Sequence, residues 1–116
     1  MKLSRPTSIE TKGRIRGKRS LEFVLFVGAD GALGDAGASL RDAGYLPVVS
    51  GNAEEAIADM HRVAFDALVV SRDVAPPARE RMLGAFRTLR PEGLVIDFDG
   101  PPRRLVASVR RAAARG

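Results

Sequence analysis

Three acidic residues stand just beyond short apolar runs, at positions where a strand would end and a loop begin. They are Asp30, Asp73 and Asp97. One or two carboxylates with water molecules are enough to bind Mg²⁺, and an ionised carboxylate also accepts phosphoryl groups. One hypothesis is therefore a Mg²⁺ site formed by these residues, with Asp73 as the phosphoacceptor. The alternative is that they form turns or cap helices, where Asp is common.

A glycine pattern offers a second chemistry. Gly28, Gly31 and Gly34 recur every third residue after the first apolar run, and glycines there would let the backbone approach a phosphate at a helix start. The spacing is not Gly-x-Gly-x-x-Gly, no Lys follows as in a P-loop, and Ser50 stands where a ribose-binding acid is expected. We therefore interpret these glycines as parts of a tight turn with close packing, and we expect no cofactor.

Composition excludes several other functions. The chain has no Cys and a single His, His61, which removes thiolate nucleophiles, Cys-type zinc sites and His-pair metal sites. The longest apolar run, residues 23–29, covers seven residues, whereas roughly 20 are needed to cross a bilayer. The basic N-terminus has no apolar stretch of a signal peptide behind it. We expect a cytoplasmic protein without membrane contact.

The net charge of +5 is unevenly distributed over the 116 residues. Residues 1–20 carry seven bases against one acid, and residues 21–116 carry twelve Arg against thirteen acids. We expect residues 1–20 to be a disordered basic arm, since they lack an apolar face to bury. Such an arm either solubilises the protein or contacts nucleic acid or an acidic partner electrostatically. The bases nearest the domain are Lys12, Arg14, Arg16, Lys18 and Arg19.

The elements that must position these residues form four strand–turn–helix units within residues 21–116, which we take as one domain. This alternation indicates an α/β fold with a parallel sheet. Right-handed crossovers then favour strand order 2-1-3-4, with the first and last helices on one face and the middle two on the other. The expected strands are Phe23–Val27, Leu46–Val49, Ala67–Val70 and Leu94–Ile96, the last one reaching Phe98. The expected helices run from about Leu33 to Ala43, over Ala53–Arg62, from Pro76 to Leu89, and onward from the turn at residues 99–102.

The segment Ser39–Ser71 resembles the receiver domain of response regulators. Three of its features match that family: the Ala43-Gly44-Tyr45 turn, the Asn-x-Glu-Glu-Ala helix start at Asn52–Ala56, and Phe65-Asp66 before a strand. Phe98-Asp99-Gly100-Pro101 likewise resembles the entry to the family's last helix. The resemblance implies a three-layer, flavodoxin-like fold and a role in bacterial two-component signalling.

The sequence departs from the family at the residues that carry its chemistry. The family's two Mg²⁺-binding acids align with Gly28 and Ala29, and its phosphoacceptor Asp aligns with Ser71. A Ser hydroxyl needs a base that no His is placed to supply. Ile96 and Asp97 stand where the family has Lys-Pro, and one of its five βα units has no counterpart. The expectation is a degenerate receiver that is not an enzyme and does not depend on phosphorylation.

Loss of one unit leaves the last strand at a sheet edge, and such edges are paired or covered. The resemblance implies partner docking at this strand and the last helix, either in a homodimer or with a bacterial signalling protein. Bases on that helix would supply complementary charge. The alternative is a nucleic-acid-associated regulator that uses the basic arm and the same helix. The helix bases are Arg103, Arg104, Arg110 and Arg111.

Overall fold

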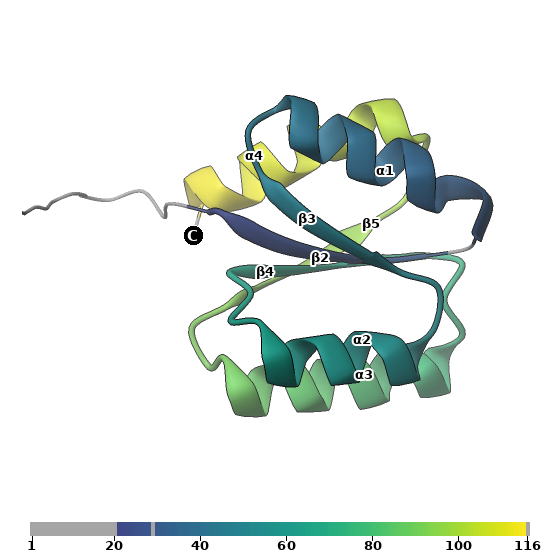
Figure 1. The fold of residues 1–116 in the computed structure, drawn as a ribbon, viewed down its shortest axis with the longest axis vertical. Helices are drawn as coiled ribbons and strands as arrows, with labels where there is room; N and C mark the ends of the chain where they lie inside the picture. Colours follow the sequence, from purple (N-terminus) through teal and green to yellow (C-terminus); the bar gives the residue numbers. More distant parts are fainter. Residues whose placement is uncertain (1–20, 29, 116) are drawn as a thin grey trace, which may run out of the picture.

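The computed structural model describes residues 21–28 and 30–115, so the expected basic arm and Ala29 lie outside the described residues. Figure 1 shows four strands and four α-helices that alternate along the chain. The elements are β2 (Phe23–Val27), α1 (Asp30–Asp42), β3 (Leu46–Ser50), α2 (Ala53–Arg62), β4 (Ala67–Ser71), α3 (Pro76–Leu89), β5 (Leu94–Phe98), the 3₁₀ turn η2 (Pro102–Arg104) and α4 (Leu105–Arg115).

The four strands form one parallel sheet in the order β3-β2-β4-β5. This order confirms the predicted 2-1-3-4 arrangement. The predicted element boundaries are close to the observed ones, and β3 and β4 each extend one residue further, to Ser50 and Ser71. Helix α1 begins at Asp30, before the first apolar position from which it was predicted. It is followed by Gly44 with φ +97°, the left-handed conformation that favours glycine after a helix.

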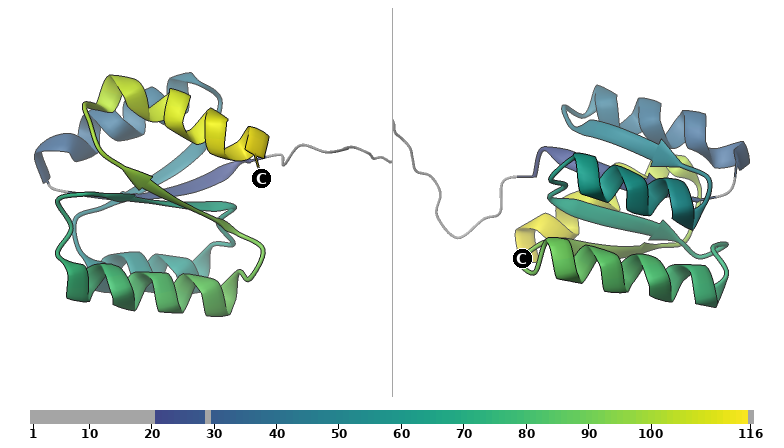
Figure 2. Two further views of the ribbon diagram at one scale, coloured as in Figure 1. Left: turned by 180° about the vertical axis from the view of Figure 1, so that it is seen from behind. Right: turned by 60° about the horizontal axis from the view of Figure 1, so that its bottom comes forward.

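Alternate residues of each strand point to opposite faces of the sheet, which divides the core in two. Helices α1 and α4 cover one face, and α2 and α3 cover the other (Figures 1 and 2). Because both faces are covered, residues 23–27 form a continuous apolar run rather than an alternating one. On the α1/α4 face the buried strand residues are Val24, Phe26, Ala67, Val69, Ile96 and Phe98. On the α2/α3 face they are Leu25, Val27, Leu68 and Val70.

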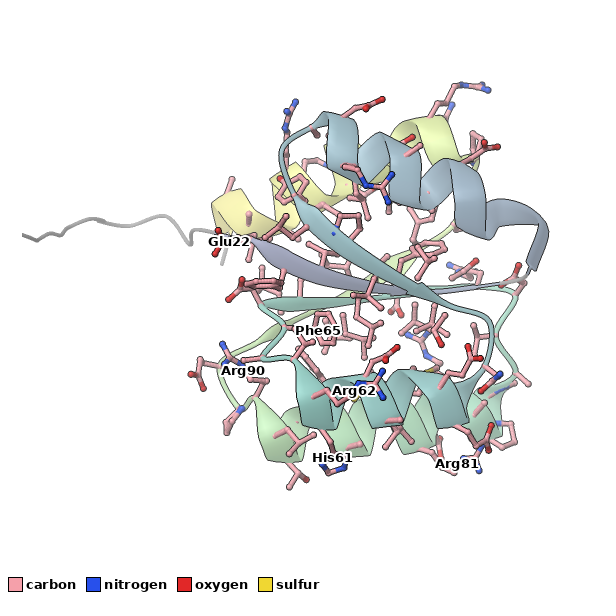
Figure 3. The ribbon with its side chains drawn as sticks, viewed as in Figure 1. Glu22, His61, Arg62, Phe65, Arg81 and Arg90 are labelled. Atoms are coloured by element: carbon pink, nitrogen blue, oxygen red, sulfur yellow. The ribbon has the colours of Figure 1, made fainter. Side chains whose placement is uncertain are left out.

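Asp66 joins the amino ends of three strands. Its carboxylate Oδ2 accepts hydrogen bonds from the backbone N–H groups of Glu22 and Phe23, at 2.9 and 3.0 Å. Its own N–H donates to the Phe23 carbonyl at 2.8 Å, and its carbonyl accepts from the Leu94 N–H at 3.0 Å. Arg90 Nη2 lies 3.7 Å from Oδ1, and Figure 3 shows Glu22, Phe65 and Arg90 at this end of the sheet. These bonds fix how β2, β4 and β5 are aligned.

Within the described residues, none of the helices combines the length and the hydrophobicity that a bilayer crossing requires.

Two glycines near α3 should respond in opposite directions to replacement by alanine. A Cβ on Gly93 would lie 2.6 Å from Cζ of the buried Phe86 ring, whereas a Cβ on Gly84 would meet nothing within 4 Å. We expect Gly93→Ala to lower the free energy of unfolding by about 1–3 kcal/mol, because the core cannot make room. Gly84→Ala should raise it by about 0.5–1 kcal/mol, because alanine is the better helix former. Urea denaturation measures both, and equal effects would contradict the packing at Gly93.

The carboxylate of Asp66 should contribute more to stability than an exposed one. We expect Asp66→Ala to lower the free energy of unfolding by about 1.5–3 kcal/mol, because two backbone N–H groups lose a charged acceptor. Asp66→Asn should cost less, since an oxygen acceptor remains. The control is Glu80→Ala, at an exposed position on α3. Thermal unfolding followed by circular dichroism tests the ranking, and an Asp66→Ala variant as stable as the Glu80→Ala variant would refute it.

Candidate functional site

The carboxyl ends of β2, β4 and β5 bring Gly28, Ser71 and Phe98 together on the α1/α4 face. A Cβ atom on the buried Gly28 would lie 2.9 Å from Cε2 of Phe26 and 3.2 Å from Cβ of Ser71. The rings of Phe26 and Phe98 meet edge to face, with centroids 6.4 Å apart and an interplanar angle of 66°. Both rings are almost fully buried. Carbon atoms of Phe26 and Ser71 therefore fill the space next to Gly28 at this end of the sheet.

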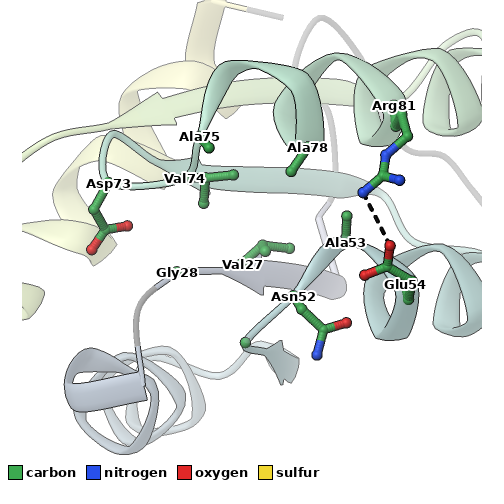
Figure 4. A pocket seen from close by; sticks show the side chains of 11 residues that line it. Val27, Gly28, Asn52, Ala53, Glu54, Asp73, Val74, Ala75, Ala78 and Arg81 are labelled. Carbon is green, nitrogen blue, oxygen red and sulfur yellow. Dashed lines mark hydrogen bonds and ion pairs between the residues drawn. The ribbon is translucent and has the colours of Figure 1, made fainter.

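A pocket of about 250 Å³ opens at the same end of the sheet but between the starts of α2 and α3. Figure 4 shows the Glu54–Arg81 ion pair at one end of this pocket and Asp73 at the other. The Arg81 Nη2 and Glu54 Oε2 atoms are 3.0 Å apart. Val27, Ala53, Val74 and Ala78 supply apolar lining between them. The pocket therefore carries two carboxylates and one guanidinium around an apolar floor.

The helix starts at this pocket have few backbone N–H groups to offer to an anion. The Asn52 side chain accepts the Glu55 N–H at 2.8 Å, and so caps α2. The Glu55 carboxylate accepts a hydrogen bond from the Ser50 hydroxyl at 3.2 Å. Helix α3 begins with Pro76 and Pro77, which have no N–H to donate. Phosphate binding at a helix start needs free N–H groups. The predicted glycines lie at α1 instead: Gly28 packs closely against Phe26 and Ser71, as predicted, whereas a Cβ on Gly34 would meet nothing within 4 Å, so the prediction of close packing is wrong there.

The three acids that could form a Mg²⁺ site are placed in different surroundings. Asp73 is exposed and lines the pocket. Asp97 lies on the sheet edge and forms an ion pair with Arg79 of α3. Asp30 is the first residue of α1, and its side chain lies outside the description. Among the described residues, no three His, Asp or Glu side chains gather to hold a metal ion. His61 is exposed in the last turn of α2, away from the pocket (Figure 3).

Two sets of the described arginines differ in their ion pairs, while Arg41, Arg72 and Arg87 belong to neither set and have no ion-pair partner among residues 21–28 and 30–115. Four arginines, on α2, α3 and the turn that follows α3, pair with acids: Arg62 with Asp59, Arg79 with Asp97, Arg81 with Glu54, and Arg90 with Asp66. The predicted interface residues Arg103, Arg104, Arg110 and Arg111 are all exposed, and none has an ion-pair partner within residues 21–28 and 30–115. The only sequence signal for this division is that no acid follows Asp99.

Comparison with known proteins shows which solved structures share this fold. No family model and no curated protein matches the sequence. Among solved structures, the chemotaxis response regulator CheY4 of Vibrio cholerae is 17% identical, with a TM-score of 0.57 over 80% of this chain and 99% of that chain. A CheY-like response regulator receiver domain protein from Methanospirillum hungatei JF-1 is 23% identical, with a TM-score of 0.60 over 82% of this chain and 78% of that chain. This chain has the fold of a receiver domain.

The described residues of the receiver-like domain form four strands where the family has five, and the position of the last strand shows how the final unit is built. β5 pairs directly with β4 and so has the sheet position of a fourth strand. The helix that follows it, α4, packs beside α1 on the opposite face from α3. The last strand therefore lies at the sheet edge, as the sequence predicted.

The two edges of the receiver-like sheet differ in their free backbone groups. Along a parallel strand, the backbone groups of alternate residues point to opposite sides. In β3, Leu46 donates to Glu22 and the Ser50 carbonyl accepts from Gly28, so Pro47 and Val49 point outward. In β5, Leu94 donates to Asp66 and the Phe98 carbonyl accepts from Arg72, so Val95 and Asp97 point outward. Pro47 removes one donor from the β3 edge, whereas the β5 edge keeps all of its groups.

The close approach of Gly28 to the Phe26 ring predicts that the cost of a substitution at position 28 depends on the side chain at position 26. Gly28→Ala should lower the free energy of unfolding by about 1–3 kcal/mol, because its Cβ would overlap a buried ring. In a Phe26→Leu background the same substitution should cost less, since the ring atoms that it meets are gone. A double-mutant cycle by urea denaturation measures this coupling. The same cost in both backgrounds would show that the ring is not the obstacle.

Proposed function

We propose that this receiver-like domain regulates a signalling process by binding a protein partner, and that it does so without phosphorylation or catalysis. The observation that carries the proposal is the packing at the carboxyl end of the sheet. The positions that align with a family acid and the phosphoacceptor are Gly28 and Ser71, and a Cβ on Gly28 would overlap the Phe26 ring. An acidic side chain at position 28 does not fit beside that ring.

The chemistry of Ser71 supports the same proposal. An acyl phosphate forms on a carboxylate that is already ionised at neutral pH, whereas a hydroxyl needs a base to take its proton. His61 lies in the last turn of α2, which runs away from the carboxyl end of the sheet. The acid nearest to Ser71 in sequence is Asp73, but it follows the end of β4 and lines the pocket between α2 and α3.

The β5 edge and the arginines of η2 and α4 form the proposed docking surface. β5 presents the outward backbone groups of Val95 and Asp97, which a partner strand could pair with. Arg103, Arg104, Arg110 and Arg111 supply positive charge beside it without competing acids in the described segment 100–115. Both a second copy of this chain and another signalling protein can use such a surface.

Phosphotransfer from acetyl phosphate tests the absence of phosphorylation. With Mg²⁺ present, intact-mass spectrometry should detect no phosphoryl adduct on the full chain, because the described residues contain no cluster of acids that could hold the metal. Asp73→Asn and the control Glu80→Gln should behave identically. An adduct that is lost in Asp73→Asn and kept in Glu80→Gln would instead establish the relocated phosphoacceptor and overturn the proposal.

A further inference from the structure

β5 lies at the edge of the sheet, and among the described residues no strand pairs with its outer side. Figure 2 shows β5 from behind, with α4 on one side and α3 on the other and no described segment crossing in front of the strand. Val95 and Asp97 each direct one N–H and one C=O away from β4, as the bonding of Leu94 and Phe98 to the β4 side requires. An extended segment that pairs with them would form a fifth strand beside β5.

The flank of α4 next to this edge is basic. Arg104, Ser108 and Arg111 recur at i, i+4 and i+7, so they lie on one stripe of the helix. An Arg111–Ser108 contact of 3.4 Å and the proximity of the Arg104 Cδ to Gly100 agree with this placement. Arg103 and Val106 lie on the other side of this helical segment. That side faces α1, because Arg103 lines a hollow together with Asp35 and Asp42 of α1, and Val106 packs against the core on the α1/α4 face. Because α4 lies over β5 and beside α1, the Arg104–Arg111 stripe faces outward over the β5 edge.

This charge decides between two occupants of the edge. A second copy that paired through its own β5 would bring the same stripe of arginines against Arg104 and Arg111, and like charges in proximity oppose association. An extended segment with acidic side chains on that face would meet guanidinium groups that have no acidic partner among the described residues. We infer that β5 accepts an acidic, extended segment of another protein as a fifth strand of the sheet. This inference rests on the docking surface proposed above and names its partner.

The geometry also specifies the pattern of that segment. Alternate side chains of a strand point to one face, about 6.6–6.8 Å apart, and seven helical residues span about 10.5 Å. Acidic residues at alternate positions would therefore lie along the stripe from Arg104 to Arg111. The intervening side chains would face the α3 side, where the half-buried Val95 and the Arg79–Asp97 ion pair lie. An alternation of acidic and apolar residues fits both faces.

A fluorescein-labelled peptide of alternating valine and glutamate, titrated with the full chain and followed by fluorescence anisotropy, tests the inference. Val95→Pro should weaken binding about tenfold, because it removes an outward donor while leaving the bonds to β4 in place. The control Val49→Pro changes the equivalent outward position on the opposite edge and should leave the affinity within about twofold. Circular dichroism verifies that both variants fold.

A second pair of variants does not depend on proline being tolerated. Arg104→Ala with Arg111→Ala should weaken binding about tenfold. The control Arg41→Ala with Arg62→Ala removes the same charge from exposed positions on α1 and α2, outside the proposed docking surface, and should change the affinity by less than about threefold. A valine–lysine peptide should not bind detectably.

Several outcomes would overturn the inference. If the valine–glutamate peptide did not bind, β5 would not accept such a segment. Binding that is unchanged by Val95→Pro and by the Arg104/Arg111 variant would show that the peptide binds to another surface. A full chain that is dimeric by sedimentation equilibrium and monomeric as Val95→Pro would assign the edge to a second copy. Binding of single-stranded oligothymidine that requires Arg104 and Arg111 but is unaffected by Val95→Pro would assign the stripe to nucleic acid. None of these outcomes affects the acetyl phosphate result, which tests the proposed function separately.

Discussion

The carboxylate of Asp66 is the interaction on which the rest of the sheet depends. It accepts backbone N–H groups from residues 43 and 44 positions earlier in the chain, and the backbone of Asp66 pairs with Phe23 and Leu94. Because paired strands are stiff, their alignment at the amino ends also sets their alignment at the carboxyl ends. Ser71 therefore lies opposite Phe98, and Val27 opposite Val70. The contacts at the opposite end follow from this alignment.

The carboxyl end of the sheet and its β5 edge differ in what they offer to other molecules. At the carboxyl end, the Phe26 ring and Ser71 occupy the space around Gly28 where a family acid would stand. At the β5 edge, backbone groups remain unpaired by the four strands of the sheet. The absence of a fifth unit among the described residues thus has two consequences: a smaller domain and an open strand. In our proposal the second consequence provides the function, because a partner supplies the strand that the chain itself lacks.

The charges follow the same division. Four arginines of α2, α3 and the turn after α3 pair with acids, as in the Glu54–Arg81 and Asp59–Arg62 pairs. Exposed pairs of this kind contribute little stability. The arginines after residue 102 have no such partners among the described residues. The basic character of the whole chain is therefore concentrated at its ends, and within the domain it lies beside β5.

The sequence alone determined the element order, the parallel sheet, its strand order and the layers. These depend on local signals, such as the apolar run 23–27, Gly44 after a helix and Asn52 before one, together with the handedness of crossovers. The positions that resemble the family's site without its acids, Gly28 and Ser71, were also visible in the sequence. Only the tertiary structure decided what fills that site and which arginines are paired. Those properties depend on contacts between residues far apart in the chain, such as Arg79 with Asp97 and Gly28 with Ser71, and no local pattern in the sequence encodes such distances.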